Sequence, residues 1–263
     1  MADADNQRHD LRPPLVAVFG PTAVGKTRLG VDLALAFGGE VVNADSRYLY
    51  RGFDIGVAKP TLAERRGVPH HLIDVLPPDP ALREGLEREI AERGLPPVAE
   101  RLRAVDPTTH ARSGTNARRV VRALEVWEAT GRPMSELEGR DPIPYRVLEI
   151  GLEMPRATLR AAVDARLDDQ IAAGLVDEVR ALLAAGVPPD APAMSSLGYR
   201  QLLPHLAGEE SLADAIRRTA HDTHRYLRHQ ETWLRRNPRL RRHDVTEPAW
   251  HERVLAETAA FLS

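Results

Sequence analysis

The chain has 263 residues, of which 43% are hydrophobic and 28% charged, and its formal net charge is −2. This composition excludes a repeat array or a disordered tail, and the length allows one large core or a core with a smaller attachment. The lack of cysteine excludes disulfides, thiolate metal sites and a cysteine nucleophile. No apolar run reaches membrane-span length and the first residues lack a signal-peptide pattern, so we expect a cytoplasmic protein that is not bound to a membrane.

The first predicted elements form a phosphate-binding loop. The apolar run Leu15–Phe19 predicts a buried strand, and the octet GPTAVGKT that follows it fits the pattern G-x-x-x-x-G-K-[ST]. A helix should come next, because apolar residues recur at Leu29, Leu33 and Phe37. In such a loop, backbone N–H groups, the helix N-terminus and the lysine surround phosphate oxygens, and the final hydroxyl can bind Mg²⁺. The candidate phosphate-binding residues are Gly20, Pro21, Thr22, Ala23, Val24, Gly25, Lys26 and Thr27, with Thr27 as the candidate metal ligand.

A second strand leads to a candidate catalytic carboxylate. Residues 40–43 predict this strand, and Asp45 follows at its carboxyl end, where ligands meet an open parallel sheet. Asp45 could simply cap the turn that follows. Opposite a phosphate loop, it could also take a proton from a nucleophile or help hold a metal. The residues alone leave both roles open.

Basic residues are unevenly distributed along the chain. Among 36 basic residues, Lys26 and Lys59 are the only lysines. A compact, rotatable ammonium fits sites where a planar guanidinium does not, so both lysines are site candidates. Lys59 precedes a proline and should project from a loop. Residues 217–242 contain nine arginines against two acidic residues. A solvated helix face would explain such a run, but the interleaved Tyr226 and Trp233 favour phosphate contacts combined with base stacking.

An ordered set of segments from Leu15 to Arg236 resembles the motifs of the bacterial tRNA dimethylallyltransferases, the tRNA isopentenyltransferase family. In chain order these segments are GPTAVGKT, NADSRYLYRGFDIGVAKPT, VPHHLIDV, RRVVRALEVWEATGRPMSE, GLVDEV, LGYRQL and THRYLRHQETWLRR. The set is far more specific than the phosphate loop alone. The resemblance implies an α/β fold with a P-loop NTPase-like parallel sheet and a helical insertion.

The resemblance also implies an activity and a set of site residues. The activity is transfer of a dimethylallyl group from dimethylallyl diphosphate to N6 of adenosine 37, in the anticodon stem-loop of tRNA, with Mg²⁺. Asp45 and Lys26 are the implied catalytic residues, with Asp45 as the base on the adenine amine. The residues that match tRNA contacts are Asp45, Ser46, Arg47, Tyr48, Arg118, Arg119, Val120, Val121, Arg122, Arg225, Arg228 and Gln230.

One block of the family pattern is missing from this chain. In the family, the HHLID-V segment leads into a helix and then a strand that ends in a glycine-rich motif. Here a short predicted strand, Leu72–Leu76, runs directly into Pro77 and Pro78, which resemble the start of a later insertion. We therefore expect an internal deletion after Leu76 and a sheet that lacks one central strand beside Leu15–Phe19. The expected organisation is a P-loop core of residues 12–76 and 116–245, including the basic helical part, with a helical insertion at residues 77–115.

Two other functions stay open at this point. Loss of a central strand with retention of the basic segment allows a tRNA-binding remnant without catalysis. The phosphate loop by itself also allows an adenylate-type isopentenyltransferase or a small-molecule kinase, although the aromatic and basic residues 217–242 argue against both. We expect the protein to be a monomer.

Overall fold

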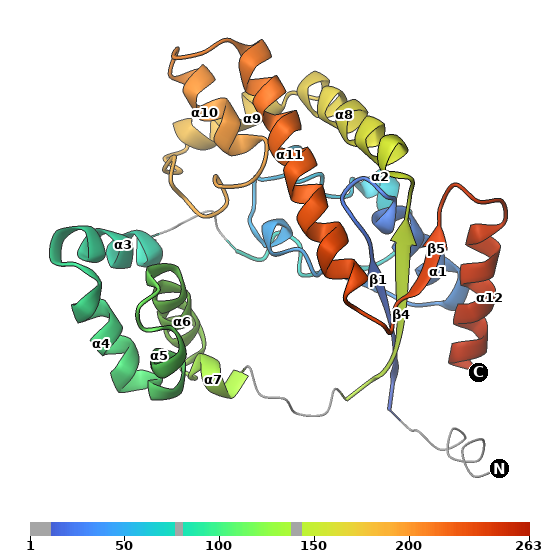
Figure 1. Ribbon diagram of the computed structural model, residues 1–263, viewed down its shortest axis with the longest axis horizontal. Helices are drawn as coiled ribbons and strands as arrows, with labels where there is room; N and C mark the ends of the chain where they lie inside the picture. The colour runs from blue at the N-terminus through green and yellow to red at the C-terminus, as the bar shows by residue number, and fades with distance from the viewer. Residues whose placement is uncertain (1–11, 77–80, 138–143) are drawn as a thin grey trace. The chain divides into compact units, whose positions relative to one another are not determined.

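A parallel strand pair carries the phosphate loop. The computed structural model describes residues 12–76, 81–137 and 144–263 (Figure 1). Strand β1 (Pro14–Phe19) pairs in parallel with β4 (Arg146–Glu153), and β4 pairs in parallel with β5 (Arg241–Asp244). Most of β4 is buried, whereas β1 is only partly covered. The predicted strand at Leu15–Phe19 and the α/β class with a parallel sheet are confirmed.

Four helices cover this sheet. Helix α1 (Lys26–Phe37) begins at the phosphate loop, α8 (Arg156–Ala172) follows β4, α11 (Leu212–Arg235) runs across the sheet and α12 (Trp250–Leu262) lies near the C-terminus (Figure 1). They share one apolar core with alternate residues of β4, and its buried members include Leu29, Leu33, Leu148, Ile150, Leu152, Leu159, Val163, Leu227 and Val254. None of the helices in the described part of the chain is both long and apolar enough to cross a membrane.

A second core lies around helices α9 (Leu175–Ala184) and α10 (Tyr199–Leu206). Phe53 and Tyr199 are completely buried there, with ring centroids 5.1 Å apart. This contact joins the loop after residue 50 to the C-terminal half of the same compact unit, which comprises Met1–Pro78 and Pro144–Ser263.

A short separate sheet carries the second half of the candidate site. Strands β2 (Val41–Val42) and β3 (His70–His71) pair in parallel with each other. Among the residues that the structure describes, neither pairs with β1, whose second edge has no strand beside it. The side chains of Leu15 and Val42 are accordingly 38% and 59% exposed. The sheet is therefore open where the sequence predicts the loss of a central strand.

The prediction of a strand at Leu72–Leu76 is wrong, because this segment forms an irregular loop. Leu72 and Asp74 adopt positive φ angles of 61° and 58°, and only Leu76 makes a bridge, to Tyr50. Leu72, Val75 and Leu76 are all exposed. The run contacts residues 48–51 through three backbone hydrogen bonds, but that neighbour is the 3-10 turn and the residues after it and not a strand, so no ladder forms. The short 3-10 helix η1 (Ser46–Leu49) and α2 (Leu62–Arg65) complete this region.

The second compact unit, Asp79–Ile143, is a small helical bundle. Its helices are α3 (Ala81–Arg93), α4 (Leu95–Val105), α5 (Pro107–Ser113), α6 (Ala117–Thr130) and α7 (Met134–Leu137). Their buried apolar core contains Leu86, Val98, Leu102, Val120, Val121 and Leu124. The unit extends beyond the insertion expected at residues 77–115 because α6 buries its apolar side against α3 and α4. Residues 77–80 and 138–143, at its two ends, lie outside the described residues.

Asp106 joins two parts of the helical bundle. Its Oδ1 accepts a hydrogen bond from the N–H of Thr109 at 2.9 Å, which caps α5, and its Oδ2 accepts one from the N–H of Ser135 at 2.9 Å in α7. Burial of the carboxyl raises its pKa, but these hydrogen bonds to the charged form dominate and lower the pKa to about 2.

Replacement of Asp106 by Ala should destabilise the helical bundle by about 2 kcal/mol, because it removes a helix cap and leaves two N–H groups without their acceptor. Urea unfolding followed by circular dichroism measures this loss. Since the folded-state pKa lies below the ordinary 3.8, the difference between wild type and Asp106→Ala should be full above about pH 4 and shrink as the pH falls toward 2. Glu100→Ala, which removes an exposed pair with Arg103, should cost less than about 0.5 kcal/mol. Equal losses for the two variants would contradict the role of Asp106.

Candidate active site

The phosphate loop has the backbone that its sequence predicts. Gly25 has a φ of 97°, in the left-handed region that favours glycine, and it precedes the first residue of α1. The Nζ atom of Lys26 donates a hydrogen bond to the carbonyl oxygen of Pro21 at 2.8 Å, so the side chain folds back over the loop. Thr27 lies exposed in the first turn of α1. Loop, lysine and helix N-terminus therefore face one anion-binding position.

Lys26 lies in an unusual electrostatic environment. Burial lowers its pKa from the ordinary 10.5 to about 8, and the guanidinium of Arg166 acts in the same direction, while the carboxylate of Asp45 opposes the shift. These three side chains are therefore close enough to influence one another. Arg166, on α8, is a site residue that the sequence does not predict, because nothing in its local pattern distinguishes it from the other arginines. Its Nη2 also donates to the carbonyl oxygen of Val57 at 3.4 Å.

Asp45 caps the turn that follows it, which is one of the two roles that the sequence left open. Its Oδ1 accepts a hydrogen bond from the N–H of Arg47 at 2.9 Å and caps η1. Its own N–H donates to Oδ1 of Asn43 at 2.8 Å, which fixes the backbone after β2. The residue is nevertheless exposed. A capping carboxylate that stays exposed is held in a defined position and can still accept a proton.

The three residues after Asp45 differ in their surroundings. Ser46 is exposed, whereas Arg47 donates to the carbonyl oxygen of Pro192 and to Oγ of Ser195. The hydroxyl of Tyr48 donates to the carbonyl oxygen of Ala58 at 2.7 Å, and its side chain also bonds to that of Thr27. Burial raises the pKa of Tyr48. Arg47 and Tyr48, both candidate tRNA contacts, thus have partners within the protein.

The candidate tRNA contacts of α11 lie on two sides of that helix. Arg225 and Arg228 are exposed, and Arg225 pairs with Asp222 at 3.4 Å. Gln230 instead turns toward the phosphate loop, where its Oε1 accepts a hydrogen bond from the N–H of Thr22 at 3.1 Å. The structure therefore places Gln230 beside the phosphate loop, on a different side of α11 from the two arginines.

The candidate tRNA contacts of α6 belong to the separate helical bundle. Arg118, Arg119 and Arg122 are exposed, so this helix presents a basic surface. Val120 and Val121 are only 0% and 1% exposed because they pack in the core of the bundle. Their side chains are therefore inside the bundle and not on its basic surface, and their assignment as tRNA contacts stays a prediction.

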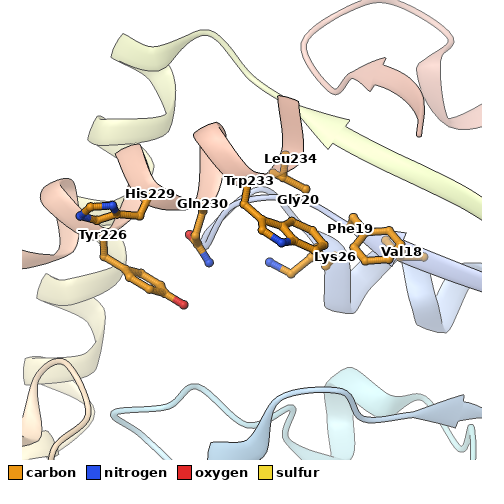
Figure 2. Close-up of a pocket in the computed structure, with 9 residues that line it drawn as sticks. All are labelled: Val18, Phe19, Gly20, Lys26, Tyr226, His229, Gln230, Trp233 and Leu234. Carbon is orange, nitrogen blue, oxygen red and sulfur yellow. The ribbon is translucent and has the colours of Figure 1, made fainter. Parts of the chain in front are cut away.

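A cavity of about 380 Å³ lies between the phosphate loop and α11. Tyr226, Gln230 and Trp233 are spaced at helical intervals and project into it from one face of α11, with Lys26 and Phe19 opposite (Figure 2). The rings of Phe19 and Trp233 lie 5.8 Å apart. The full lining comprises Val18, Phe19, Gly20, Lys26, Tyr226, His229, Gln230, Trp233 and Leu234.

A carboxylate holds the loop of residues 54–56 in place. The side chain of Glu178 accepts hydrogen bonds from the N–H groups of Asp54, Ile55 and Gly56 at 3.1, 2.7 and 3.2 Å. It also accepts one from the hydroxyl of Tyr199, whose pKa is raised by burial and by this carboxylate. A Cβ at Gly56 would lie 2.2 Å from the ring of Tyr199, so only glycine fits there. The segments GLVDEV and LGYRQL, which contain Glu178 and Tyr199, therefore support the site from outside it.

The side chain of Lys59 is buried and has a structural role. Its side chain is only 4% exposed, and Nζ contacts Oδ1 of Asp54 at 2.8 Å, Oδ1 of Asp74 at 2.5 Å and the carbonyl oxygen of Tyr50 at 2.5 Å. With its donors satisfied internally, this ammonium joins the chain around residue 54 to the chain around residue 74. The expectation that Lys59 projects from its loop is wrong.

Known proteins match this chain over most of its length. A model of the IPP transferase family matches residues 48–81 and 76–237, two segments that meet where the sequence predicts a deletion. The tRNA dimethylallyltransferase of Thermomicrobium roseum is 48% identical over 295 residues, covering 92% of this chain and 90% of that protein. The tRNA dimethylallyltransferase of Roseiflexus sp. is 42% identical over 279 residues, covering 86% and 92%. Both alignments are longer than this chain, so both relatives contain residues without a counterpart here.

Solved structures agree with the sequence matches. The full-length tRNA isopentenylpyrophosphate transferase of Bacillus halodurans has a TM-score of 0.66 at 30% identity, covering 95% of this chain and 96% of that one. The tRNA delta(2)-isopentenylpyrophosphate transferase of Staphylococcus epidermidis has a TM-score of 0.67 at 26% identity, covering 95% and 98%. The chain therefore belongs to the IPP transferase family.

Proposed function

We propose that this protein transfers the dimethylallyl group of dimethylallyl diphosphate to N6 of adenosine 37 in tRNA. The observation that carries the proposal is that Asp45, at the end of β2, lies near Lys26 of the phosphate loop, close enough for its carboxylate to act against the lowering of the pKa of Lys26 by burial. A cation for the leaving group and a carboxylate for the attacking amine are the two groups that this transfer needs. The relatives named as tRNA dimethylallyltransferases support the same substrates.

The phosphate loop is the proposed diphosphate site. When the bond between C1 of the donor and its bridging oxygen breaks, the diphosphate leaves with the electron pair and negative charge builds on that oxygen. The N–H groups of residues 23–27, the ammonium of Lys26 and the guanidinium of Arg166 can neutralise this charge without reorganisation.

The described residues fit Mg²⁺ that is bound mainly by the donor. Within residues 12–76, 81–137 and 144–263, no cluster of three or more His, Asp or Glu side chains could hold a metal by itself. Mg²⁺ keeps several waters and often uses substrate phosphates with one or two protein oxygens, and the exposed hydroxyl of Thr27 is such an oxygen. Bound there, Mg²⁺ would add positive charge beside the diphosphate.

Asp45 is the proposed base on the acceptor. The N6 amine attacks C1 of the donor, a nitrogen–carbon bond replaces the carbon–oxygen bond, and the N6 proton passes to the Asp45 carboxylate. An adenine in a loop must first be turned out of its stack to reach this position.

Exposed arginines of α11 and α6, including Arg225, Arg228 and Arg119, would hold the anticodon stem-loop through its phosphates. We propose that the protein acts on tRNA as a monomer in the cytoplasm.

The open edge of β1 favours a second candidate function, which is tRNA binding without catalysis. A partly exposed β1 is less firmly held than a strand paired on both sides, and the phosphate loop begins at its end. The basic residues of α11 do not depend on that edge. Transfer and binding therefore have to be measured separately.

Incubation of the chain with radiolabelled dimethylallyl diphosphate, Mg²⁺ and unmodified tRNA should place label in the tRNA. Lys26→Ala should reduce the rate by at least about 100-fold because leaving-group charge loses its main cation. Asp45→Asn should reduce it by about 100-fold because the amide cannot accept the proton. Asp177→Asn, an exposed carboxylate on α9, is the matched control and should stay within about twofold of wild type. Salt-sensitive tRNA binding without any label in the wild-type experiment would contradict the transferase and support the second candidate.

The affinity for inorganic pyrophosphate should depend on pH through Lys26. A lysine is charged below its pKa, and the pKa of Lys26 is about 8, so the affinity should fall by about tenfold between about pH 7 and about pH 9.5. Lys26→Arg stays charged over this range and should show a flatter profile. Isothermal titration of both proteins measures the ratio of their affinities, from which the ionisation of pyrophosphate itself cancels. Parallel profiles would contradict the lowered pKa of Lys26.

A further inference from the structure

Gln230 is a polar residue on the inward face of α11. Leu227 lies three positions before it and Leu234 four positions after it, so the three side chains share one face of the helix. Both leucines are buried, with exposed fractions of 3% and 8%. Gln230 is partly buried and lies between Tyr226 and Trp233 (Figure 2). A polar side chain within such an apolar stripe needs a specific hydrogen-bond partner.

Gln230 and Lys26 hold the two sides of one peptide group in the phosphate loop. The carbonyl oxygen of Pro21 accepts a hydrogen bond from Nζ of Lys26 at 2.8 Å. The N–H of Thr22, in the same peptide group, donates to Oε1 of Gln230 at 3.1 Å. Because an ammonium has three N–H donors, Lys26 can keep its bond to the loop and still donate to a phosphate oxygen. The orientation of this peptide group is therefore set from both sides.

The backbone beside this peptide group is strained. Ala23 follows Thr22 directly and has a φ of 65°, in the left-handed region that is unfavourable for a residue with a Cβ. A loop keeps such a conformation only where the contacts around it restrain the backbone. The bond from Thr22 to Gln230 is a restraint of this kind, and it adjoins the N–H groups of residues 23–27 that point toward the anion-binding position.

Helix α11 is itself fastened to α8 on both sides of Gln230 in the sequence. Nε2 of His224 lies 2.8 Å from Oδ1 of Asp164, and Glu231 pairs with Arg156. These contacts fix the position of the helix independently of the phosphate loop. The amide of Gln230 is therefore presented to the loop in a defined place, so the loop can be held ready for a ligand.

We propose that Gln230 is a positioning residue of the donor site, which holds the peptide group of Pro21 and Thr22 and keeps the phosphate loop in the form that binds diphosphate. The inference rests on the proposed function, because it takes this loop as the diphosphate site. It gives Gln230 a role different from the tRNA contact that the family resemblance implies. The amide oxygen faces the loop, on a different side of α11 from the exposed Arg225 and Arg228.

Amide hydrogen exchange at Thr22, followed by NMR in the full chain, tests the hydrogen bond without any substrate. Gln230→Met keeps the length of the side chain but lacks the oxygen acceptor, so the Thr22 amide should exchange at least about tenfold faster than in wild type. Gln230→Glu keeps an oxygen at the same position and should hold the exchange rate within about threefold of wild type. Thr232→Ala, an exposed position of the same helix, is the control and should leave the rate unchanged.

Isothermal titration with inorganic pyrophosphate and Mg²⁺ measures the effect on the proposed donor site. Gln230→Met should weaken pyrophosphate binding by about fivefold, because the loop loses one hydrogen bond and has to be ordered when the ligand binds. Gln230→Glu should weaken it through charge repulsion, and only this loss should shrink as salt is added. The affinity of Gln230→Met for unmodified tRNA should stay within about twofold of wild type.

The outcomes separate this inference from the proposed function. Weaker tRNA binding by Gln230→Met, with Thr22 exchange and pyrophosphate affinity as in wild type, would identify Gln230 as an RNA contact and overturn the inference alone. Prenyl transfer by the wild type, combined with an unchanged pyrophosphate affinity in Gln230→Met, would also overturn it and leave the function standing. A wild-type chain that binds no pyrophosphate would overturn both.

Discussion

The parallel pairing of β1 with β4 is the constraint on which the site depends. The phosphate loop starts where β1 ends, so the register of this one ladder sets the position of Lys26 and the direction of α1. β4 can serve as the reference because it is buried and paired with β5 on its other side. A shift of β1 by one residue would exchange its two faces and move the loop with it. The position of the phosphate loop is therefore set by a single strand pair.

Side-chain contacts link the parts of the core that are not joined by strand pairing. β2 and β3 form a sheet of their own. β2 precedes Asp45, and β3 precedes Asp74, which pairs with Lys59. Glu178 binds three successive N–H groups of the loop at residues 54–56, and hydrogen bonds to a charged group contribute about 1.5–3 kcal/mol each. Lys59 ties the same loop to Asp74. Because these contacts are directional and most of them are partly buried, they can hold the chain between β2 and residue 76 in place without a continuous sheet.

The open edge of β1 leaves apolar residues exposed, and the cavity lined by Phe19 and Trp233 lies at the end of the same strand. Leu15 and Val42 are exposed, so the apolar surface beside the open edge is not fully covered. At the end of β1, the space next to Phe19 is bounded instead by Trp233 of α11. Lys26 at one end and aromatic rings at the other give this space a charged and an apolar pole. The cavity beside the phosphate loop and the open edge of β1 thus lie in one region of the structure.

The sequence by itself determined the elements that depend on local spacing. These are the phosphate loop with α1, the helices after residue 81 and the interruption of the family pattern after Leu76, because loop geometry and helical periodicity are set by residues a few positions apart. Tertiary structure alone decided the burial of Val120, the orientation of Gln230 and the cavity. The bond between Thr22 and Gln230 joins residues 208 positions apart. No local pattern encodes such a contact, because it arises only when β1, β4 and α11 have packed together.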